Sequence, residues 1–194
     1  MGPHSEHRTS SVLVPVTHGT EDLEAVATID ILRRAGCHVV VAGIDDTTLV
    51  CARKVRILAD ARWEEIQPDV FDMIAVPGGA AGTERFLAHP PLHDAIRRAA
   101  AGGRWVAAIC AAPLVLQAAG VLQGRRATCH PAVRERLIAA TYESSAVVVD
   151  GRVITSQGAG TAVQFALTIV HHVCGEAVAA RVASDIVYPW PPRC

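Results

Sequence analysis

Cys110 is the residue of this sequence whose position most favours chemistry. It follows a short apolar run, Arg104–Ile109, and Ala111, Ala112 and Pro113 come directly after it. This pattern is typical of a strand, a sharp turn and a helix. The side chain would project above the sheet, where the positive end of the helix dipole favours the nucleophilic thiolate. A small buried core residue is the alternative, since free cysteines are often buried.

Two glycines could supply backbone donors to the same site. Gly78 and Gly79 follow Pro77 at the end of another apolar run, Phe71–Val76. Without a Cβ, their N–H groups can approach a ligand closely. Together with the N–H of Ala111 they could form an oxyanion hole. An ordinary tight turn between strand and helix is the alternative interpretation.

Glu24 is the candidate acid or base. It lies in the first turns of a predicted helix, among Leu23, Ala25, Val26 and Ala27. A glutamate on the apolar side of this helix would be partly buried and have a raised pKa. As a neutral acid it could donate a hydrogen bond to a thiolate, or act in general acid–base catalysis. The alternative is that it only complements the helix dipole.

Histidines offer a further partner for Cys110. His130 follows a short predicted strand, Ala127–Cys129, and a cysteine and a histidine within reach of each other suggest an acyl-transfer dyad. A simple turn residue before Pro131 is the alternative. His18, in the loop after the first strand, is expected to line the mouth of the site.

The elements that must position these residues alternate between strands and helices. Ser11–Thr17, Asp22–Ala35 and Cys37–Gly43 are predicted to form a strand, a helix and a strand, which is a βαβ unit. Thr20 or Asp22 is expected to cap the helix. The helix face predicted to be buried carries Leu23, Val26, Ala27, Ile31 and Leu32.

The rest of the chain continues the pattern. We predict an antiparallel excursion over Leu49–Leu58, strands over Phe71–Val76 and Arg104–Ile109, helices over Gly82–Ala101 and from Ala111 to Gly120, a type I′ hairpin at Asp150-Gly151, and helices over Thr161–Val173 and Glu176–Ser184. Sites in such open α/β sheets form at the carboxyl ends of the strands, where the candidate residues lie.

Composition fits one α/β domain. The chain has 194 residues, of which 51% are hydrophobic and only 4% aromatic, so the core is built from aliphatic side chains. The net charge is −1 and there is no basic stripe, which argues against nucleic-acid binding. No apolar run reaches the roughly 20 residues that span a bilayer, so no membrane association is expected.

The cysteines and the termini suggest a reducing compartment. The six cysteines show neither a Cys-x-x-Cys pair nor zinc-type spacing, and are expected to be free thiols in the cytoplasm: Cys37, Cys51, Cys110, Cys129, Cys174 and Cys194. Residues 1–10 are polar, without the apolar region of a secretory signal. We predict a disordered lead-in over 1–10, a single domain over 11–187 and a tail over 188–194.

Four segments, in this order, carry a family resemblance: Glu21–Ala25, Pro77–Gly79, Ala107–Pro113 and Thr155–Thr161. The sequence resembles the ThiJ/PfpI superfamily, in the branch that contains the Parkinsonism-associated protein deglycase and its bacterial homologues. The resemblance runs from about Ser11 to Val187. It implies a flavodoxin-like three-layer sandwich with a mostly parallel, doubly wound sheet, a cysteine at a nucleophile elbow, and a homodimer.

The resemblance also implies roles for single residues. Cys110 corresponds to the nucleophilic, oxidation-sensitive cysteine, Glu24 to a protonated glutamate that hydrogen-bonds it and lowers its pKa, Gly79 and Ala111 to backbone donors, His130 to a nearby histidine, and Arg34 and Arg53 to arginines that meet across the dimer near the site. No metal or organic cofactor is implied.

The function implied is a cysteine-dependent glyoxalase or protein deglycase. Such an enzyme converts methylglyoxal, or early glycation adducts on protein side chains, to a 2-hydroxy acid without glutathione, and protects against oxidative stress. The alternative is a non-enzymatic redox sensor or chaperone in which Cys110 is oxidised to the sulfinic acid. A peptidase is disfavoured by Ala111, where the protease-like branch has histidine. A lyase or hydratase is disfavoured by Glu24, where those relatives use aspartate.

Overall fold

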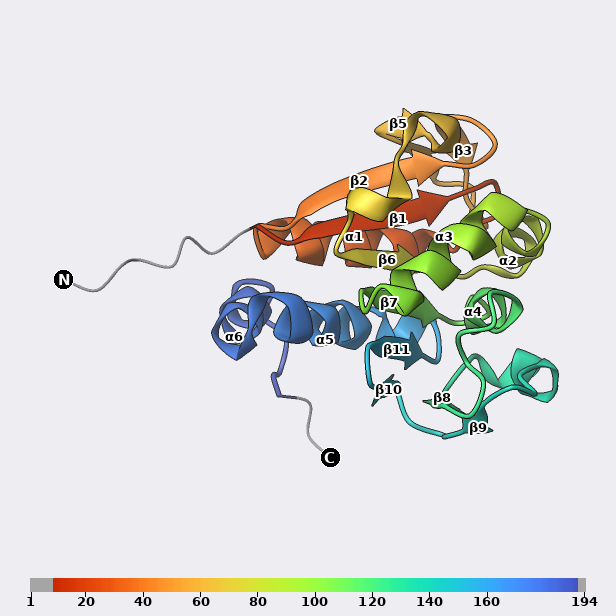
Figure 1. Cartoon of the computed structure of the whole chain (residues 1–194). Helices are drawn as coiled ribbons and strands as arrows, with labels where there is room; N and C mark the ends of the chain where they lie inside the picture. Colours follow the sequence, from red (N-terminus) through yellow and green to blue (C-terminus); the bar gives the residue numbers. More distant parts are fainter. Residues whose placement is uncertain (1–8, 192–194) are drawn as a thin grey trace.

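The fold is built on one seven-stranded sheet, shown in the computed structural model in Figure 1. The structure describes residues 9–191, so residues 1–8 of the predicted lead-in and 192–194 of the predicted tail lie outside the described residues. The strand order is β10-β11-β7-β6-β1-β2-β5. Its strands are β1 Ser11–Val16, β2 His38–Gly43, β5 Ala61–Arg62, β6 Met73–Val76, β7 Trp105–Ile109, β10 Val147–Asp150 and β11 Val153–Ser156.

The sheet is parallel except at one edge. Only β10 runs antiparallel, in a hairpin with β11. The five strands β2-β1-β6-β7-β11 give the flavodoxin-like order 2-1-3-4-5 when they are numbered along the chain. The order reverses between β1 and β6, and this is where such sheets bind their ligands.

Helices cover both faces of the sheet, which gives three layers and confirms the predicted flavodoxin-like sandwich (Figure 1). On one face α1, α5 and α6 pack on a core that includes Val12, Val14 and Phe165. On the other face α2, α3 and α4 pack around Leu13 and Phe86. The helices are α1 Asp22–Arg34, α2 Ala80–Leu87, α3 Pro90–Ala101, α4 Pro113–Ala118, α5 Ala162–Cys174 and α6 Glu176–Asp185.

Short strands and 3-10 helices lie outside the main sheet. Two small two-stranded sheets lie outside the main one: β3 Thr48–Val50 with β4 Arg56–Leu58, and β8 Arg126–Ala127 with β9 Thr141–Tyr142. The 3-10 helices are η1 Trp63–Glu65, η2 Pro68–Val70, η3 Pro131–Arg136 and η4 Ala159–Thr161. Within residues 9–191, no helix is both long and apolar enough to cross a membrane.

Two predictions of local structure are wrong. The helix expected over Gly82–Ala101 is broken into α2 and α3, because Pro90 begins α3 and forces His89 out of the helical conformation. The hairpin turn is not type I′, which needs two consecutive left-handed residues. Only Gly151 is left-handed there, with φ of 59°, and Arg152 is not.

The prediction for the start of α1 is also wrong. Glu21 occupies the N-cap position, and no side chain caps the helix. Thr20 instead accepts the backbone N–H of Thr17 at 3.0 Å. The expected apolar face is only partly buried, because Leu23 and Val26 are 54% and 48% exposed.

Candidate active site

Cys110 occupies a strained elbow between β7 and α4. Its φ is 67°, in the left-handed region that residues with a Cβ rarely adopt. The turn is held from two sides: the Cys110 N–H donates to the Ser156 carbonyl at 2.9 Å, and its carbonyl accepts the His130 N–H at 2.7 Å. Strain of this kind is concentrated at functional sites. The thiol at this elbow is partly exposed and lines a pocket, so it is not a fully buried core residue.

Glu24 is a fully buried carboxyl beside this thiol. It lies in the first turn of α1, and its Oε2 accepts the backbone N–H of Gly78 at 2.8 Å. Its Oε1 is buried, and no N–H or O–H group of residues 9–191 donates to it. The Cys110 thiol beside the carboxyl can donate to it, as the family resemblance implies. Loss of water raises the pKa of Glu24 to about 7, against a partly compensating bond from Gly78. Glu24 can therefore hold or release a proton near neutral pH.

The thiol of Cys110 is held in its protonated form. Burial raises its pKa to about 12, and the neighbouring Glu24 carboxylate acts in the same direction. The backbone N–H groups of Gly79 and Ala111 lower the pKa, but by less. The expectation of a lowered thiol pKa is therefore wrong, because desolvation outweighs the donors of the turn.

The two glycines are required by close packing. A Cβ on Gly78 would lie 2.7 Å from the Cys110 Cβ and 2.8 Å from Glu24 Oε2. Gly79 has φ of 96°, and a Cβ there would collide with the Gly19 carbonyl. The Gly78 N–H is already used by Glu24, so the donors left for an oxyanion are those of Gly79 and Ala111.

A pocket of about 320 Å³ opens above the thiol. Its polar lining comes from Glu21, Glu24, Arg53, Cys110 and His130. Its apolar wall comes from Ala80, Ala132, Val133 and Ala159, with Gly79 and Ala111 beside the sulfur. A site of this size and mixed lining suits a small polar molecule.

His130 stands at the exposed rim of the pocket. Its Nδ1 accepts the N–H of Ala132 at 3.2 Å, which leaves Nε2 as the nitrogen that carries the proton in the neutral ring. Gly158 lies between this ring and the thiol: its absent Cβ would be 3.2 Å from His130 Cδ2 and 3.9 Å from Cys110 Sγ. The sequence signal for Gly158 is its place in the segment Thr155–Thr161, which does not by itself reveal this contact.

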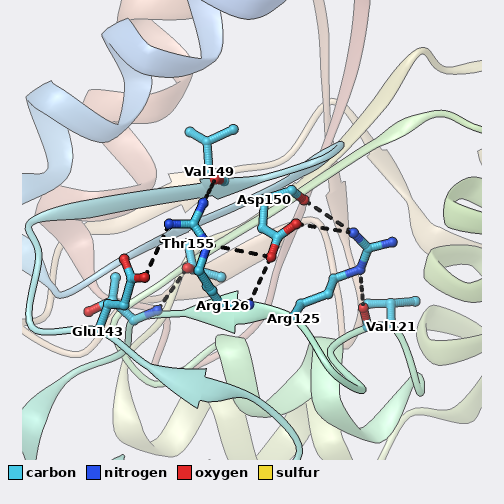
Figure 2. A network of polar contacts seen from close by, with 8 residues as sticks. Val121, Arg125, Arg126, Glu143, Val149, Asp150 and Thr155 are labelled. Carbon is cyan, nitrogen blue, oxygen red and sulfur yellow. Dashed lines mark hydrogen bonds and ion pairs between the residues drawn. The ribbon is translucent and has the colours of Figure 1, made fainter.

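A polar network fixes the strand that leads to His130 (Figure 2). The backbone N–H of Arg126 donates to Asp150 Oδ2 at 2.9 Å, and its guanidinium pairs with Glu143 at 3.1 Å. Next along the chain, the buried N–H of Thr128 donates to Thr155 Oγ1 at 2.9 Å. The β10–β11 hairpin thus sets the position of the His130 backbone, even though β8 is not part of the main sheet.

Asp22 is a structural residue of the site that sequence reasoning missed. Its buried carboxylate accepts the N–H of Arg53 at 2.7 Å and that of Val55 at 2.9 Å. This holds the β3–β4 turn against the start of α1 and brings Arg53 to the pocket, where its Nε lies 4.0 Å from Glu21 Oε1. The contact joins residues about thirty positions apart, and no local sequence signal announces it.

Two predicted residues lie away from the pocket of this chain. His18 does not line it, and its Nδ1 instead accepts the Val50 N–H at 3.1 Å, so that prediction is wrong. Arg34 lies at the end of α1, where its Nε donates to Asp30 at 2.7 Å. The prediction that Arg34 meets Arg53 across a dimer needs a second chain and stays a prediction.

Comparison with known proteins places this site in a family. Residues 10–172 match the sequence profile of the DJ-1/PfpI family. The protein DJ-1 homolog B of Arabidopsis thaliana is 41% identical over 92% of this chain, but this chain spans only 42% of its length. The protein dj-1beta of Drosophila melanogaster is 37% identical, with 94% of this chain and 99% of the relative covered.

Two further comparisons concern activity and structure. A protein of Caenorhabditis elegans named glutathione-independent glyoxalase DJR-1.2 is 34% identical, over 87% of this chain and 90% of its own. The crystal structure of Drosophila melanogaster DJ-1beta superposes with a TM-score of 0.91 at 36% identity, and covers 94% of this chain and all of that one. The similarity therefore includes the strands and helices that carry the pocket.

Proposed function

Because the chain belongs to the DJ-1/PfpI family, we propose that it is a cysteine-dependent glyoxalase that converts methylglyoxal and similar 2-oxoaldehydes to 2-hydroxy acids without glutathione. One observation carries this proposal: the buried Glu24, with a pKa of about 7, sits beside the Cys110 thiol in a small pocket. The relative named as a glutathione-independent glyoxalase supports the choice of reaction.

The first step forms a carbon–sulfur bond. The Cys110 sulfur attacks the aldehyde carbon of methylglyoxal, and its proton passes to the Glu24 carboxylate. The aldehyde oxygen gains negative charge as the bond forms, and the N–H groups of Gly79 and Ala111 stabilise it. Glu24 then gives its proton to that oxygen, which yields a hemithioacetal on Cys110 and restores the Glu24 carboxylate.

The second step moves a proton between two carbons. Glu24 removes the proton from the carbon bound to sulfur, which gives an enediol, and returns a proton to the neighbouring carbon. The hydroxyl proton on the sulfur-bearing carbon passes to the neighbouring oxygen, and the product is a thioester. Water then cleaves the thioester, releasing lactate and restoring the thiol. The net reaction adds one water to methylglyoxal, and no metal or organic cofactor takes part.

The pocket lining supports a small reactive carbonyl as substrate. Ala80, Ala132 and Val133 leave room for a methyl group, while Arg53 places a positive charge near the carboxylate that the reaction produces. His130, with Nε2 available as a donor, can assist proton transfer at the rim. An early glycation adduct on a protein side chain would reach the same thiol through the open side of the pocket.

A homodimer is part of the proposal. Leu23 and Val26 of α1 lie 54% and 48% exposed, as do Val55 at 48% and Leu58 at 75% around the β3–β4 turn. Exposed apolar side chains gathered on adjacent elements are typical of an interface. A second chain seated here would lie next to Arg53 and the pocket rim. The cytoplasmic location stays a prediction.

Oxidation of Cys110 is the competing function. The thiol is partly exposed in an open pocket, and the donors of Gly79 and Ala111 could stabilise the oxygens of a sulfinate. A redox sensor or chaperone would use this chemistry without turning over a carbonyl substrate. Lactate release from methylglyoxal therefore distinguishes the two functions.

The test is lactate release from methylglyoxal in buffer without glutathione. We expect Cys110→Ser to lower kcat/KM by about 10³-fold or more, because the hydroxyl is a far weaker nucleophile. Cys51→Ala is the matched control, since this buried cysteine does not line the pocket, and it should retain activity. Equal lactate release by the wild type and Cys110→Ser, or no lactate from either, would overturn the proposal.

A further inference from the structure

A second pair of thiols lies far from the catalytic pocket. Cys37 precedes β2 and Cys174 ends α5, so both lie at the amino ends of the strands, opposite the carboxyl ends where Cys110 is found. Their sulfurs are 3.4 Å apart although 137 positions separate the residues in the chain. A disulfide has an S–S distance of about 2.05 Å, so the sulfurs need to approach by only about 1.4 Å.

The two thiols differ in their access to solvent. Cys37 is 7% exposed. Cys174 is less buried and lines a separate cavity of about 230 Å³, together with Thr9, Ser10 and Gly36. A small oxidant can therefore reach the Cys174 sulfur through this cavity, whereas the Cys37 sulfur is less accessible.

We propose that Cys37 and Cys174 form a second redox site, a dithiol that a hydroperoxide oxidises to an intramolecular disulfide. Cys174 is the sulfur that reacts with the peroxide, and Cys37 is the one that resolves the product. The site is separate from the glyoxalase pocket, and it does not depend on Cys110.

The local chemistry favours this division of roles. The Cys37 thiol can donate a hydrogen bond to the Cys174 sulfur, which lowers the pKa of Cys174 to about 7, and the Ser10 hydroxyl acts in the same direction. The same contact, with burial, raises the pKa of Cys37 above its ordinary range. Burial of Cys174 acts against its thiolate, but less than the hydrogen bond from Cys37 favours it. The helix dipole at the end of α5 also opposes the thiolate.

The reaction balances with one peroxide. The Cys174 thiolate attacks the O–O bond, so that an S–O bond forms and hydroxide leaves, giving a sulfenic acid. The Cys37 sulfur then attacks the sulfenic sulfur, the S–S bond forms, and the S–O bond breaks to release the second oxygen as water after it takes the Cys37 proton. In total, two thiols and one hydrogen peroxide give one disulfide and two molecules of water, and an alkyl hydroperoxide gives one water and one alcohol instead.

The disulfide would link two distant segments: the one that connects α1 to β2, and the end of α5. The helices α1 and α5 pack against each other on one face of the sheet. Closing a loop of this length restricts the unfolded chain, and should raise the melting temperature by roughly 5–10 °C.

The test is peptide mapping of the full chain in a Cys110→Ser background. After one equivalent of hydrogen peroxide and alkylation of free thiols, we expect a linked peptide pair that contains Cys37 and Cys174 and is two hydrogens lighter. The chain should remain monomeric in mass on a non-reducing gel, and dithiothreitol should reverse both the link and the rise in melting temperature.

Single variants separate the two roles. Cys37→Ser keeps a hydroxyl that can donate to the Cys174 sulfur but cannot form a disulfide, so it should stop at a sulfenic acid on Cys174 that dimedone traps. Cys174→Ala should leave Cys37 reduced. Cys51→Ala, which removes another buried cysteine, should still form the link. The proposal is overturned if Cys37 and Cys174 are alkylated as fully as before peroxide, or if oxidised Cys174 links to other cysteines instead. These outcomes leave the glyoxalase reaction at Cys110 untouched.

Discussion

The chemistry of the proposed site depends on where a few protons sit on Cys110 and Glu24. Burial disfavours the charged form of both groups, so that the thiol is neutral and the carboxyl titrates near pH 7. A substrate that accepts the sulfur lets the thiol proton move to Glu24. The same carboxyl is then ready to act on carbon. One acid of tuned pKa can therefore serve both steps of the reaction.

The raised pKa of Glu24 makes a prediction about stability. Between about pH 4.5 and 7 the unfolded chain releases this proton while the folded chain keeps it, so Glu24 makes the free energy of unfolding fall as pH rises. Glu24→Gln removes this cost and still offers an oxygen to the Gly78 N–H. We expect the variant to be more stable than the wild type by about 3 kcal/mol at pH 8, and similar at pH 4.

Urea denaturation of both proteins across this pH range measures the difference. The control is Glu64→Gln, an exposed glutamate whose replacement should leave the pH dependence unchanged. A Glu24→Gln variant that is less stable than the wild type at pH 8 would contradict the raised pKa. The variant should nevertheless be inactive, which separates the stability of the site from its function.

Three strand ends bring the site together. β1 leads into α1 with Glu24, β6 leads into the two glycines, and β7 leads into Cys110. This convergence could be predicted from the sequence, because each apolar run is followed by a distinctive turn and parallel strands end at one edge of the sheet. The contact of Asp22 with the β3–β4 turn could not, since it joins segments with no local pattern in common.

The break between α2 and α3 does have a signal in the sequence. Pro90 and Pro91 interrupt an otherwise helical pattern, and the residue before a proline avoids the helical conformation. The raised pKa of the Cys110 thiol could not be predicted from the sequence. A sequence shows the helix start that favours a thiolate, but it does not show how much water the folded chain removes from the sulfur.

The close packing between these strand ends predicts the effect of a single methyl group. Gly78→Ala would place a Cβ 2.7 Å from the Ile109 carbonyl and from the Cys110 Cβ. We expect a loss of stability of about 2 kcal/mol or more, and a larger loss of activity, because the elbow must shift. Gly160→Ala is the control, since nothing lies within 4 Å of its Cβ position. Thermal unfolding and lactate release measure both, and a fully active Gly78→Ala variant would contradict the packing.

At the scale of the whole molecule, the proposed dimer interface is the apolar face formed by Leu23, Val26, Val55 and Leu58. The sequence assigned Leu23 and Val26 to the core, because apolar spacing on a helix does not distinguish a buried core face from a subunit interface. The structure places them at the surface instead. The folded chain alone therefore leaves this face unpartnered among the described residues.

One variant tests this assembly. Leu58→Asp should turn the dimer into a monomer, with little effect on the folding of a side chain that is 75% exposed. Val70→Asp is the matched control, because Val70 is 66% exposed on η2, away from this face. Sedimentation equilibrium distinguishes the two states. A wild type that is already monomeric, or a Leu58→Asp variant that stays dimeric, would show that this face is not the interface.

The dependence of lactate release on pH tests the central claim most directly. If the Glu24 carboxylate receives the Cys110 proton, kcat/KM for methylglyoxal should rise about tenfold per pH unit below pH 7 and level off above it. Glu24→Gln should remove this rise of kcat/KM with pH, together with most of the activity. A profile that stays flat from pH 5 to 8, or a step near pH 7 that persists in Glu24→Gln, would contradict the account of how this thiol is activated.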